Sequence, residues 1–454
     1  MITSAIIFVL SFALVLGVTP SIIAWANKAN HLDQPDSYRK AHHAAVPRLG
    51  GIPLFLVFFS ICIFAIFMRP EEAWQWGIIL FCNTLLFAVG LWDDFKPLGA
   101  KVKLIAQISI AFLAYFLGLK ISQISYPLGD YSISLGAWSV ILTVLWLISV
   151  PNLINLIDGI DGLATGLGFF LFISIGFAAQ DQADVTWVSF AMAGALLGFL
   201  RYNFPPAKIF LGDAGAYLIG FAVATISLKS ANKGAVMATL FVTVLALGLP
   251  IMDTAFAILR RALRGFPLFK ADADHIHHRL QHLGFSKRRV VLGMYLVSVV
   301  LSCIGLNVLW TQGRSLPVAI ALVFVMIIVG VLSLGYFWSW DDLKGQLNRT
   351  IIRRPEVQYT LLQAKVMELE VERCQNFAEF EACLAIALQR VGFELHLHPE
   401  TKITRPLTLT FKNDQSLRLY APSRESLRHW QRLAECFREP YAKALQKWPS
   451  AAER

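Results

Sequence analysis

Charged residues are scarce in this chain, and their scarcity excludes most soluble folds. Asp, Glu, Lys and Arg make up 15% of the 454 residues, whereas 56% are hydrophobic. A soluble domain averages about 25% charged residues. The six cysteines include no CxxC pair, so the sequence suggests neither a disulfide framework nor a zinc site. We interpret these cysteines as small buried hydrophobic residues. No repeat at a fixed period is present.

Long apolar runs are abundant instead. They recur from the first residue to about residue 340, and about 20 helical residues cross the core of a bilayer. The pattern predicts an all-α polytopic membrane protein with about 11 transmembrane helices. The first run has no basic leader and no clear cleavage site, so we interpret it as a span. The expected spans are 3–25, 50–68, 74–92, 103–119, 137–156, 163–179, 186–200, 214–229, 235–259, 290–310 and 316–340.

The loops between these runs predict an orientation. Lys and Arg are concentrated in the loops after the odd-numbered spans, above all in 26–49 and 260–289. Cytoplasmic loops carry the excess of Lys and Arg, so we expect the N-terminus outside and the residues after 340 inside. This asymmetry accounts for most of the net charge of +10, and nucleic acid is not an expected partner.

Carboxylates gather at the expected cytoplasmic ends of spans. Asp93 and Asp94 lie in "GLWDDFKPLGAKVK", Asp158 and Asp161 in "NLINLIDGIDGLATG", and Asp213 in "KIFLGDAGAYLIGF". A transporter of lipid-linked sugars is one alternative, but transporters hold ionisable groups near the bilayer midplane. Clusters on one side of the membrane favour a site that faces the cytoplasm.

The stretch 152–166 has a polar residue at every third position. These residues are Asn152, Asn155, Asp158 and Asp161, and their short loop has no Lys or Arg. Solvated loop residues are the alternative interpretation. The repulsion between the two carboxylates has no local relief, which favours an external cation such as Mg²⁺.

Asp213 lies between glycine and alanine, which allow a phosphate–metal complex to approach the backbone. Mg²⁺ prefers carboxylate, phosphate and water oxygens, so Asp213 with Asn155 or another aspartate would suit it. The alternative is a helix N-cap at Asp213. The Asp93–Asp94 pair has an alternative too, since it could simply end a helix before a turn.

The largest expected cytoplasmic loop contains "HIHH", which is His275, His277 and His278. Zinc binding is one possibility, but no cysteine or HExxH pattern supports it. Basic residues in the same loop favour phosphate binding. A loop that only anchors the topology would explain those basic residues and leave the histidines unexplained.

The first expected cytoplasmic loop reads "SYRKAHHAAVPRLGG" and contains Lys40 and Arg48. Basic groups at a membrane surface face anionic lipid headgroups. Carboxylates for a divalent metal and cations for phosphates are the equipment of phosphoryl transfer. Their position at the bilayer boundary implies a lipid substrate.

Five stretches in order carry a resemblance to a known family: "RKAHHAAVPRLGG", "GLWDDFKPLGAKVKL", "PNLINLIDGIDGLATG", "FLGDAGAYLIG" and "ADADHIHHRL". Residues 1 to about 340 resemble the polyprenyl-phosphate N-acetylhexosamine-1-phosphate transferase superfamily (glycosyltransferase 4), and most closely its WecA/TagO-type branch. The resemblance implies transfer of N-acetylhexosamine 1-phosphate, with GlcNAc 1-phosphate expected, from a UDP-sugar to undecaprenyl phosphate. UMP is released, and the product initiates a cell-surface polysaccharide. Mg²⁺ is the implied cofactor, with Mn²⁺ as a substitute. The implied location is the bacterial cytoplasmic (inner) membrane.

The resemblance also implies roles for individual residues. Asp93 and Asp94 would be the catalytic pair, and Asp213 would bind the metal with Asn155. The implied substrate-binding residues are Lys40, Lys101, Lys103, Asn152, Asp158, Asp161, His275, His277 and His278. An intramembrane aspartyl protease could use the "LGDAG" stretch, but it would leave the other motifs unexplained.

Residues 341–454 differ in composition from the transferase domain expected over 1–340. Charges become frequent, residues 355–393 and 423–448 each predict a helix, and 393–399 and 407–422 alternate as strands around "KNDQS". We expect a small cytoplasmic α+β domain without a catalytic motif. Formation of a homodimer and contact with later enzymes are both open roles for it.

Overall fold

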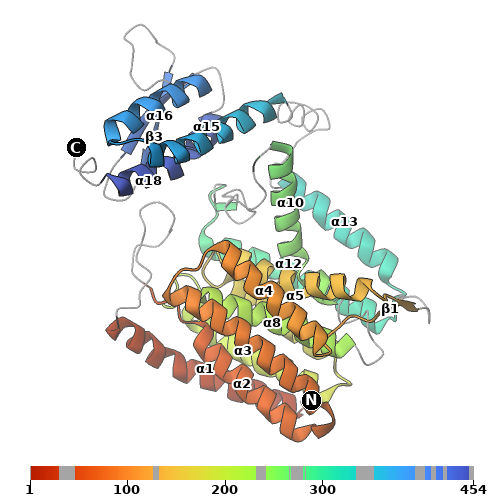
Figure 1. The fold of residues 1–454 in the computed structure, drawn as a ribbon. Helices are drawn as coiled ribbons and strands as arrows, with labels where there is room; N and C mark the ends of the chain where they lie inside the picture. Colours follow the sequence, from red (N-terminus) through yellow and green to blue (C-terminus); the bar gives the residue numbers. More distant parts are fainter. Residues whose placement is uncertain are drawn as a thin grey trace. The chain divides into compact units, whose positions relative to one another are not determined.

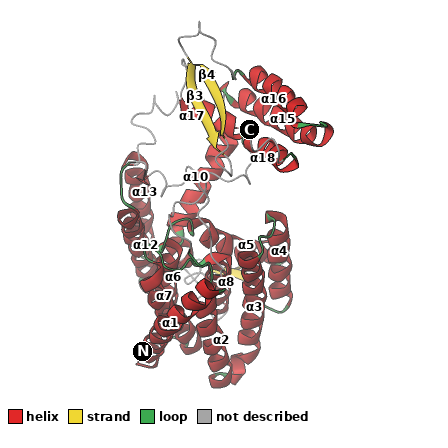
Figure 2. Cartoon of the chain, turned by 90° about the vertical axis from the view of Figure 1, so that its left-hand side faces the viewer, coloured by secondary structure: helices red, strands yellow, loops and turns green. Residues whose placement is uncertain are grey.

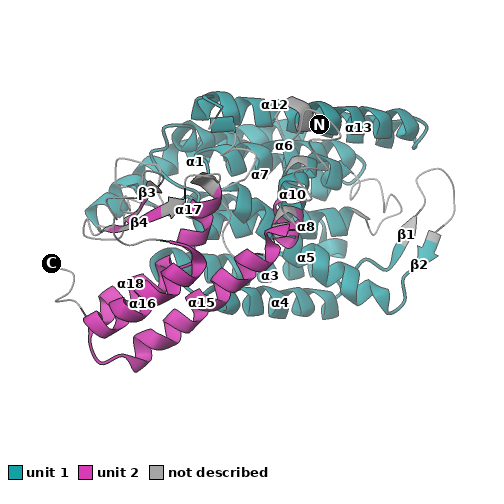
Figure 3. Cartoon of the chain, turned by 90° about the horizontal axis from the view of Figure 1, so that it is seen from above, with its two compact units in different colours: residues 1–34, 44–255, 273–336 teal, residues 35–43, 256–272, 337–454 magenta. Residues whose placement is uncertain are grey.

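The structure is a computed structural model, and it divides the chain into two compact units (Figure 3). It describes residues 2–29, 46–125, 132–231, 242–264, 266, 280–281, 283–333, 352–393, 404–410, 416–422 and 427–448. One unit comprises 1–34, 44–255 and 273–336, and the other comprises 35–43, 256–272 and 337–454.

Helices make up nearly all of the first unit, and its long helices run side by side (Figures 1 and 2). They are α1 (Ile2–Lys28), α2 (Gly51–Met68), α3 (Ala73–Phe95), α4 (Ala100–Phe116), α5 (Trp138–Ile157), α6 (Leu163–Ala178), α7 (Ala183–Asn203), α8 (Gly212–Ala231), α12 (Lys287–Trp310) and α13 (Leu316–Ser333). A short 3₁₀ turn, η1 (Pro70–Glu72), precedes α3, and strands β1 (Gln123–Ser125) and β2 (Ser132–Ser134) form an antiparallel pair. Helix α10 (Gly248–Arg264) has residues in both units.

The apolar runs therefore fold as helices, as expected. Each of the eleven expected spans overlaps one helix of the described chain. Six of these helices are long and apolar enough to cross a membrane, and α6 and α13 contribute shorter apolar segments. The protein is a helical multi-pass membrane protein. The number of eleven spans stays a prediction.

Helix α8 forms the centre of the first unit. Every residue from 211 to 230 is buried, and α8 packs against α2, α3, α5 and α6. Small residues allow this close packing, because a Cβ added to Gly90 of α3 would lie 2.7 Å from the Ala214 backbone. The ends of α3 and α8 are therefore held against each other.

A buried ion cluster holds the opposite end of α8. The Lys229 side chain is fully buried, and its Nζ lies 2.8 Å from Glu72 Oε2 and 3.2 Å from Asp184 Oδ2. Trp76 Nε1 donates a hydrogen bond of 2.9 Å to the same Asp184 oxygen. Because buried charges are costly unless paired, this cluster ties α8 to η1, α3 and α7.

The second unit contains α15 (Arg354–Arg373), α16 (Phe377–Val391), β3 (Thr404–Thr410), β4 (Ser416–Pro422), α17 (Leu427–Glu435) and α18 (Arg438–Lys447). The strands expected within 407–422 are present as the antiparallel pair β3–β4. Residues 394–399 of the other expected strand and the turn at 411–415 lie outside the described residues. Side chains such as Phe380, Leu388, Leu419, Leu433 and Phe437 form the core of this unit.

Two single helices expected in this region were wrong, because each is a pair. The helix expected over 355–393 breaks after α15, and Asn376 caps α16 by accepting a hydrogen bond of 2.9 Å from the Glu379 backbone N–H. The helix expected over 423–448 breaks between α17 and α18. Pro440 lies in the first turn of α18, where a missing N–H costs nothing.

Candidate active site

The first turn of α8 receives its cap from another helix. The backbone N–H groups of Asp213 and Ala214 donate to Asp94 Oδ1 and Oδ2 at 2.9 and 3.0 Å. The first N–H groups of a helix have no partner within the helix, and Asp94 supplies one from the end of α3. Gly212 has a φ of 75°, and a Cβ there would lie 2.6 Å from Asp94 Oδ2. Only glycine fits this position without strain.

A lysine joins the other two carboxylates of the cluster. Lys103 Nζ, from the first turn of α4, donates to Asp213 Oδ2 at 2.8 Å and to Asp93 Oδ2 at 3.2 Å. The Leu98 backbone N–H donates to Asp93 Oδ1 at 2.7 Å. The side chains of Asp93 and Asp213 are each 10% exposed and that of Lys103 is 21% exposed, whereas Asp94 is fully enclosed. Asp93, Asp213 and Lys103 are therefore the members of this cluster that a ligand could reach.

Arg48 approaches the same carboxylates from the segment before α2. Phe210 N donates to Pro47 O at 2.8 Å and Gly50 N donates to Phe210 O at 3.0 Å, which fixes this segment beside the loop that enters α8. The Arg48 guanidinium lies 3.7 Å from Asp213 Oδ1 and 4.0 Å from Asp94 Oδ1. Its side chain is 41% exposed, so it can also bind a ligand.

The turn after α5 belongs to the same electrostatic cluster. Burial raises the pKa of Asp158 well above its ordinary value; Arg48 lowers this pKa, and the carboxylates of Asp213, Asp94 and Asp161 raise it. Asp161 Oδ2 accepts a hydrogen bond of 3.1 Å from the Ala207 backbone N–H, which joins this turn to the loop before α8. Asp158 and Asp161 thus lie close to the cluster.

The two asparagines before this turn differ. The Asn152 side-chain amide donates a hydrogen bond of 2.6 Å to Gln107 Oε1 of α4 and another of 2.7 Å to Ile148 O. Asn155 lies in the last turn of α5, and its backbone oxygen accepts a hydrogen bond of 3.3 Å from the Asp158 N–H. The structure therefore places Asn152 between α4 and α5, and the expected metal-binding role of Asn155 stays a prediction.

The remaining expected residues lie apart from the cluster or outside the described residues. Lys101 is exposed at the start of α4. Four of the predicted residues lie outside the described part of the chain: Lys40, His275, His277 and His278. Their predicted roles stay predictions.

Sequence reasoning gave no role to two neighbours of the cluster. Gln107 and Tyr217 lie one helical turn after Lys103 and Asp213, so they share the faces of α4 and α8 that carry the cluster. Tyr217 interacts with Gln107 and with the charges of Asp213 and Lys103. The spacing of four residues was the signal in the sequence for both.

Comparisons with known proteins assign the chain to a family. The chain is 34% identical over 331 residues, 72% of its length, to a probable undecaprenyl-phosphate N-acetylglucosaminyl 1-phosphate transferase of Bacillus subtilis, and it covers 90% of that protein. The chain belongs to glycosyl transferase family 4. The family's own model matches residues 76–231, which contain Asp93, Lys103 and Asp213.

Other relatives in glycosyl transferase family 4 come from distant bacteria. The undecaprenyl-phosphate alpha-N-acetylglucosaminyl 1-phosphate transferase of Escherichia coli K12 is 31% identical over 62% of this chain and 77% of that protein. A decaprenyl-phosphate N-acetylglucosaminephosphotransferase of Mycobacterium tuberculosis is 33% identical over 57% of this chain and 71% of that protein. The matches cover the larger part of each relative.

Proposed function

We propose that this chain transfers N-acetylglucosamine 1-phosphate from UDP-GlcNAc to undecaprenyl phosphate and releases UMP. The names of its relatives support the reaction type, the transferred group and the lipid substrate. The observation that carries the proposal is the cluster of Asp93, Asp213 and Lys103, which lies within the matched residues 76–231. It brings acidic and basic groups together where three helices of a membrane protein end or begin.

Mg²⁺ fits the charges and donor atoms of this site. Asp93, Asp94, Asp158, Asp161 and Asp213 bring five carboxylates to the region, and among the described residues Lys103 and Arg48 are the cations that approach Asp93, Asp94 and Asp213 within 4.0 Å. Carboxylate oxygens are the ligands that Mg²⁺ prefers, usually one or two beside phosphate oxygens and water. Asp213, whose side chain is 10% exposed, would hold the ion together with Asn155. We propose Mn²⁺ as a substitute.

The reaction is a direct displacement. An oxygen of the lipid phosphate attacks the β-phosphorus of UDP-GlcNAc, and the bond to the bridging oxygen breaks so that UMP leaves. A bound divalent ion supplies electrostatic stabilisation of the diphosphate charge. Lys103 and Arg48 add positive charge beside the same phosphates, where it stabilises the negative charge of the transition state.

The two aspartates at the end of α3 take different parts in this proposal. Asp93 accepts the remaining proton of the lipid phosphate, because its side chain is 10% exposed and its Oδ2 accepts from a side chain, Lys103, rather than from the backbone. Asp94 is a positioning residue, because both of its oxygens accept backbone N–H groups of α8. At pH 7 a phosphate with a second pKa near ~6 is already largely ionised, so the step through Asp93 contributes modestly.

We also propose the orientation given by the charged loops. The protein would lie in the bacterial inner membrane with eleven spans, its N-terminus outside and the cluster on the cytoplasmic side, where UDP-sugars are made. The loops with Lys40 and with His275, His277 and His278 would bind substrate phosphates. Residues 341–454 would then be cytoplasmic.

Purified protein in detergent tests the reaction. With UDP-GlcNAc, undecaprenyl phosphate and Mg²⁺, we expect UMP and a lipid-linked diphosphate sugar in equal amounts. Asp213→Asn should be nearly inactive, whereas Asp181→Asn, an exposed acid outside the cluster, should match wild type. A transporter or a protease would release no UMP, and absence of UMP with every UDP-N-acetylhexosamine would exclude the proposal.

Cysteine labelling tests the orientation. In a variant without native cysteines, Pro97→Cys and Pro206→Cys lie in exposed loops beside the cluster. They should react with a membrane-impermeant thiol reagent only after cells are opened. Glu71→Cys and Asp181→Cys are exposed near the opposite ends of α3 and α7 and should react in intact cells. The reverse pattern would contradict a cytoplasmic site.

A further inference from the structure

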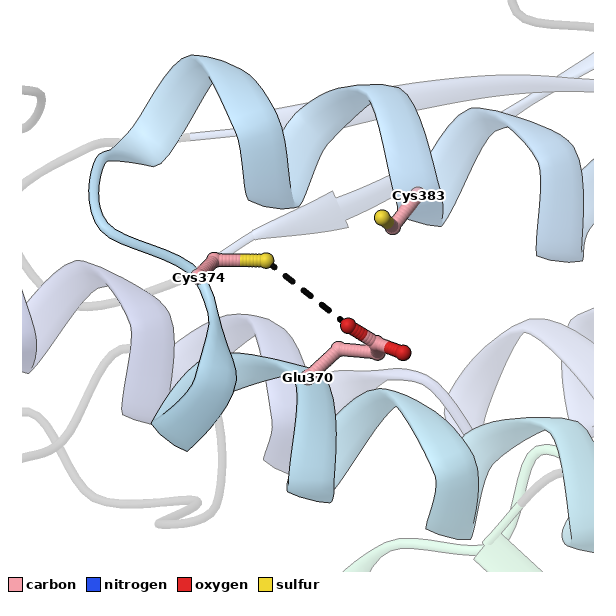
Figure 4. Close-up of side chains that lie close together, drawn as sticks. All are labelled: Glu370, Cys374 and Cys383. Carbon is pink, nitrogen blue, oxygen red and sulfur yellow. Dashed lines mark hydrogen bonds between the residues drawn. The ribbon is translucent and has the colours of Figure 1, made fainter.

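Two cysteines that seemed unrelated in the sequence meet in the second unit. Cys374 ends α15 and lies one turn after Glu370, whereas Cys383 lies in the second turn of α16. Because α15 and α16 pack against each other, all three side chains point into the space between the two helices (Figure 4). Cys374 is buried, as expected, and Cys383 is half-buried.

The three side chains offer a close set of ligand atoms. One oxygen of Glu370 and the two sulfur atoms all lie within 4.8 Å of one another, and Cys374 Sγ lies 3.8 Å from Glu370 Oε2. Zn²⁺ binds sulfur at about 2.3 Å and carboxylate oxygen at about 2.0–2.2 Å, so ligands in one tetrahedral shell lie roughly 3.5–4 Å apart. The largest distance between these ligand atoms therefore needs to shorten by only about 1 Å for all three to bind one ion.

We propose that Glu370, Cys374 and Cys383 form a binding site for a thiol-preferring divalent cation, with Zn²⁺ as the expected ion. Thiolate ligands select zinc over Mg²⁺, which prefers oxygen. Each thiol gives its proton to water on binding, and a water molecule completes four-coordination. The ion would fasten the end of α15 to α16. This inference does not depend on the proposed transferase activity.

Arg373 makes the site testable, because its guanidinium forms an ion pair with the Glu370 carboxylate. Its Nε lies 2.5 Å from Glu370 Oε2, and its terminal nitrogen lies 3.9 Å from Cys383 Sγ. The Arg373 side chain is 64% exposed, so it can turn away into solvent. A positive group beside the ligands opposes a cation, and its removal should therefore strengthen metal binding.

Zinc affinity of the full-length protein in detergent tests the proposal. Competition with a chromophoric chelator, with excess Mg²⁺ to occupy carboxylate sites, should give one tightly held Zn²⁺ per chain. Cys383→Ser and Glu370→Gln should weaken binding by more than about tenfold. Cys436→Ser, a buried cysteine of the same unit outside the cluster, should bind as wild type does. Arg373→Ala should bind several-fold more tightly.

The spectrum of bound Co²⁺ identifies the ligands. Wild type should show the charge-transfer absorption of a thiolate–cobalt bond, and Cys383→Ser should lose part of it. No thiolate band, or unchanged zinc affinity in Cys383→Ser, would overturn the proposal. Weaker binding by Arg373→Ala would also overturn it, since that result would make Arg373 a structural support. Loss of both free thiols to a Cys374–Cys383 disulfide under air, without metal uptake, would show a thiol pair instead.

Discussion

Asp93 and Asp94 are adjacent in sequence, yet the structure predicts different effects on stability when each is changed to asparagine. The backbone N–H groups of Asp213 and Ala214 donate to the two oxygens of Asp94 at 2.9 and 3.0 Å. In Asp94→Asn, the one remaining oxygen can accept from one of these N–H groups, and the NH₂ group faces the other N–H. A buried donor without a partner costs about 1–3 kcal/mol. We expect the free energy of unfolding to fall by about that amount, with activity lost as well.

Asp93→Asn should behave differently. Its Oδ1 can still accept from Leu98 N, and Lys103 keeps its ion pair with Asp213 at 2.8 Å. No backbone donor loses its partner, so stability should fall less than in Asp94→Asn. Loss of a general base lowers turnover by about 10²–10⁴-fold, and a partly ionised phosphate places the expected loss at the lower end.

Unfolding in mixed micelles, followed beside UMP release, measures both quantities. Asp181→Asn is the control. If Asp94→Asn proves as stable as wild type and inactive while Asp93→Asn keeps full activity, then the assignment of the two roles is refuted.

Three further predictions follow from the same contacts. Lys229→Met removes the ammonium that lies 2.8 and 3.2 Å from the carboxylates of Glu72 and Asp184. The free energy of unfolding should fall by about 3–5 kcal/mol, because these carboxylates lose their partner. A fall below about 1 kcal/mol, measured in micelles, would contradict a stabilising role of the ion cluster. Gly212→Ala forces a side chain into a left-handed position beside Asp94, at a cost of at least about 1–2 kcal/mol. It should lower UMP release, unlike Gly99→Ala, where a Cβ meets nothing within 4 Å. Removal of divalent ions with EDTA should abolish UMP release and Mg²⁺ should restore it, whereas activity that persists in EDTA would exclude a metal role.

The helices could be predicted from the sequence because a bilayer requires long apolar runs whose backbone groups are bonded internally. Each expected span overlaps a helix. The breaks in the second unit were harder to predict, because residues 355–393 and 423–448 keep helical composition through them. An N-cap at Asn376 begins α16, and Pro440 lies in the first turn of α18. Single residues of this kind are weak signals in a sequence.

The motifs predicted which residues gather, and the structure adds how they bond. Asp93, Asp158, Asp161, Asp213 and Lys103 meet in one region, as their expected positions at one side of the membrane suggested. The capping of α8 by Asp94 could not be predicted, because it depends on how closely α3 and α8 approach at Gly90. The meeting of Cys374 with Cys383 likewise depends on the break between α15 and α16.

The stereochemical course at the transferred phosphorus tests direct displacement at this cluster. UDP-GlcNAc made chiral at the β-phosphorus with sulfur and oxygen isotopes would be converted by the purified protein, and the configuration of the lipid-linked product determined. A single attack by the lipid phosphate, with Lys103 and Arg48 beside the diphosphate, predicts inversion. Retention would require two displacements through a covalent enzyme intermediate, and would contradict this account.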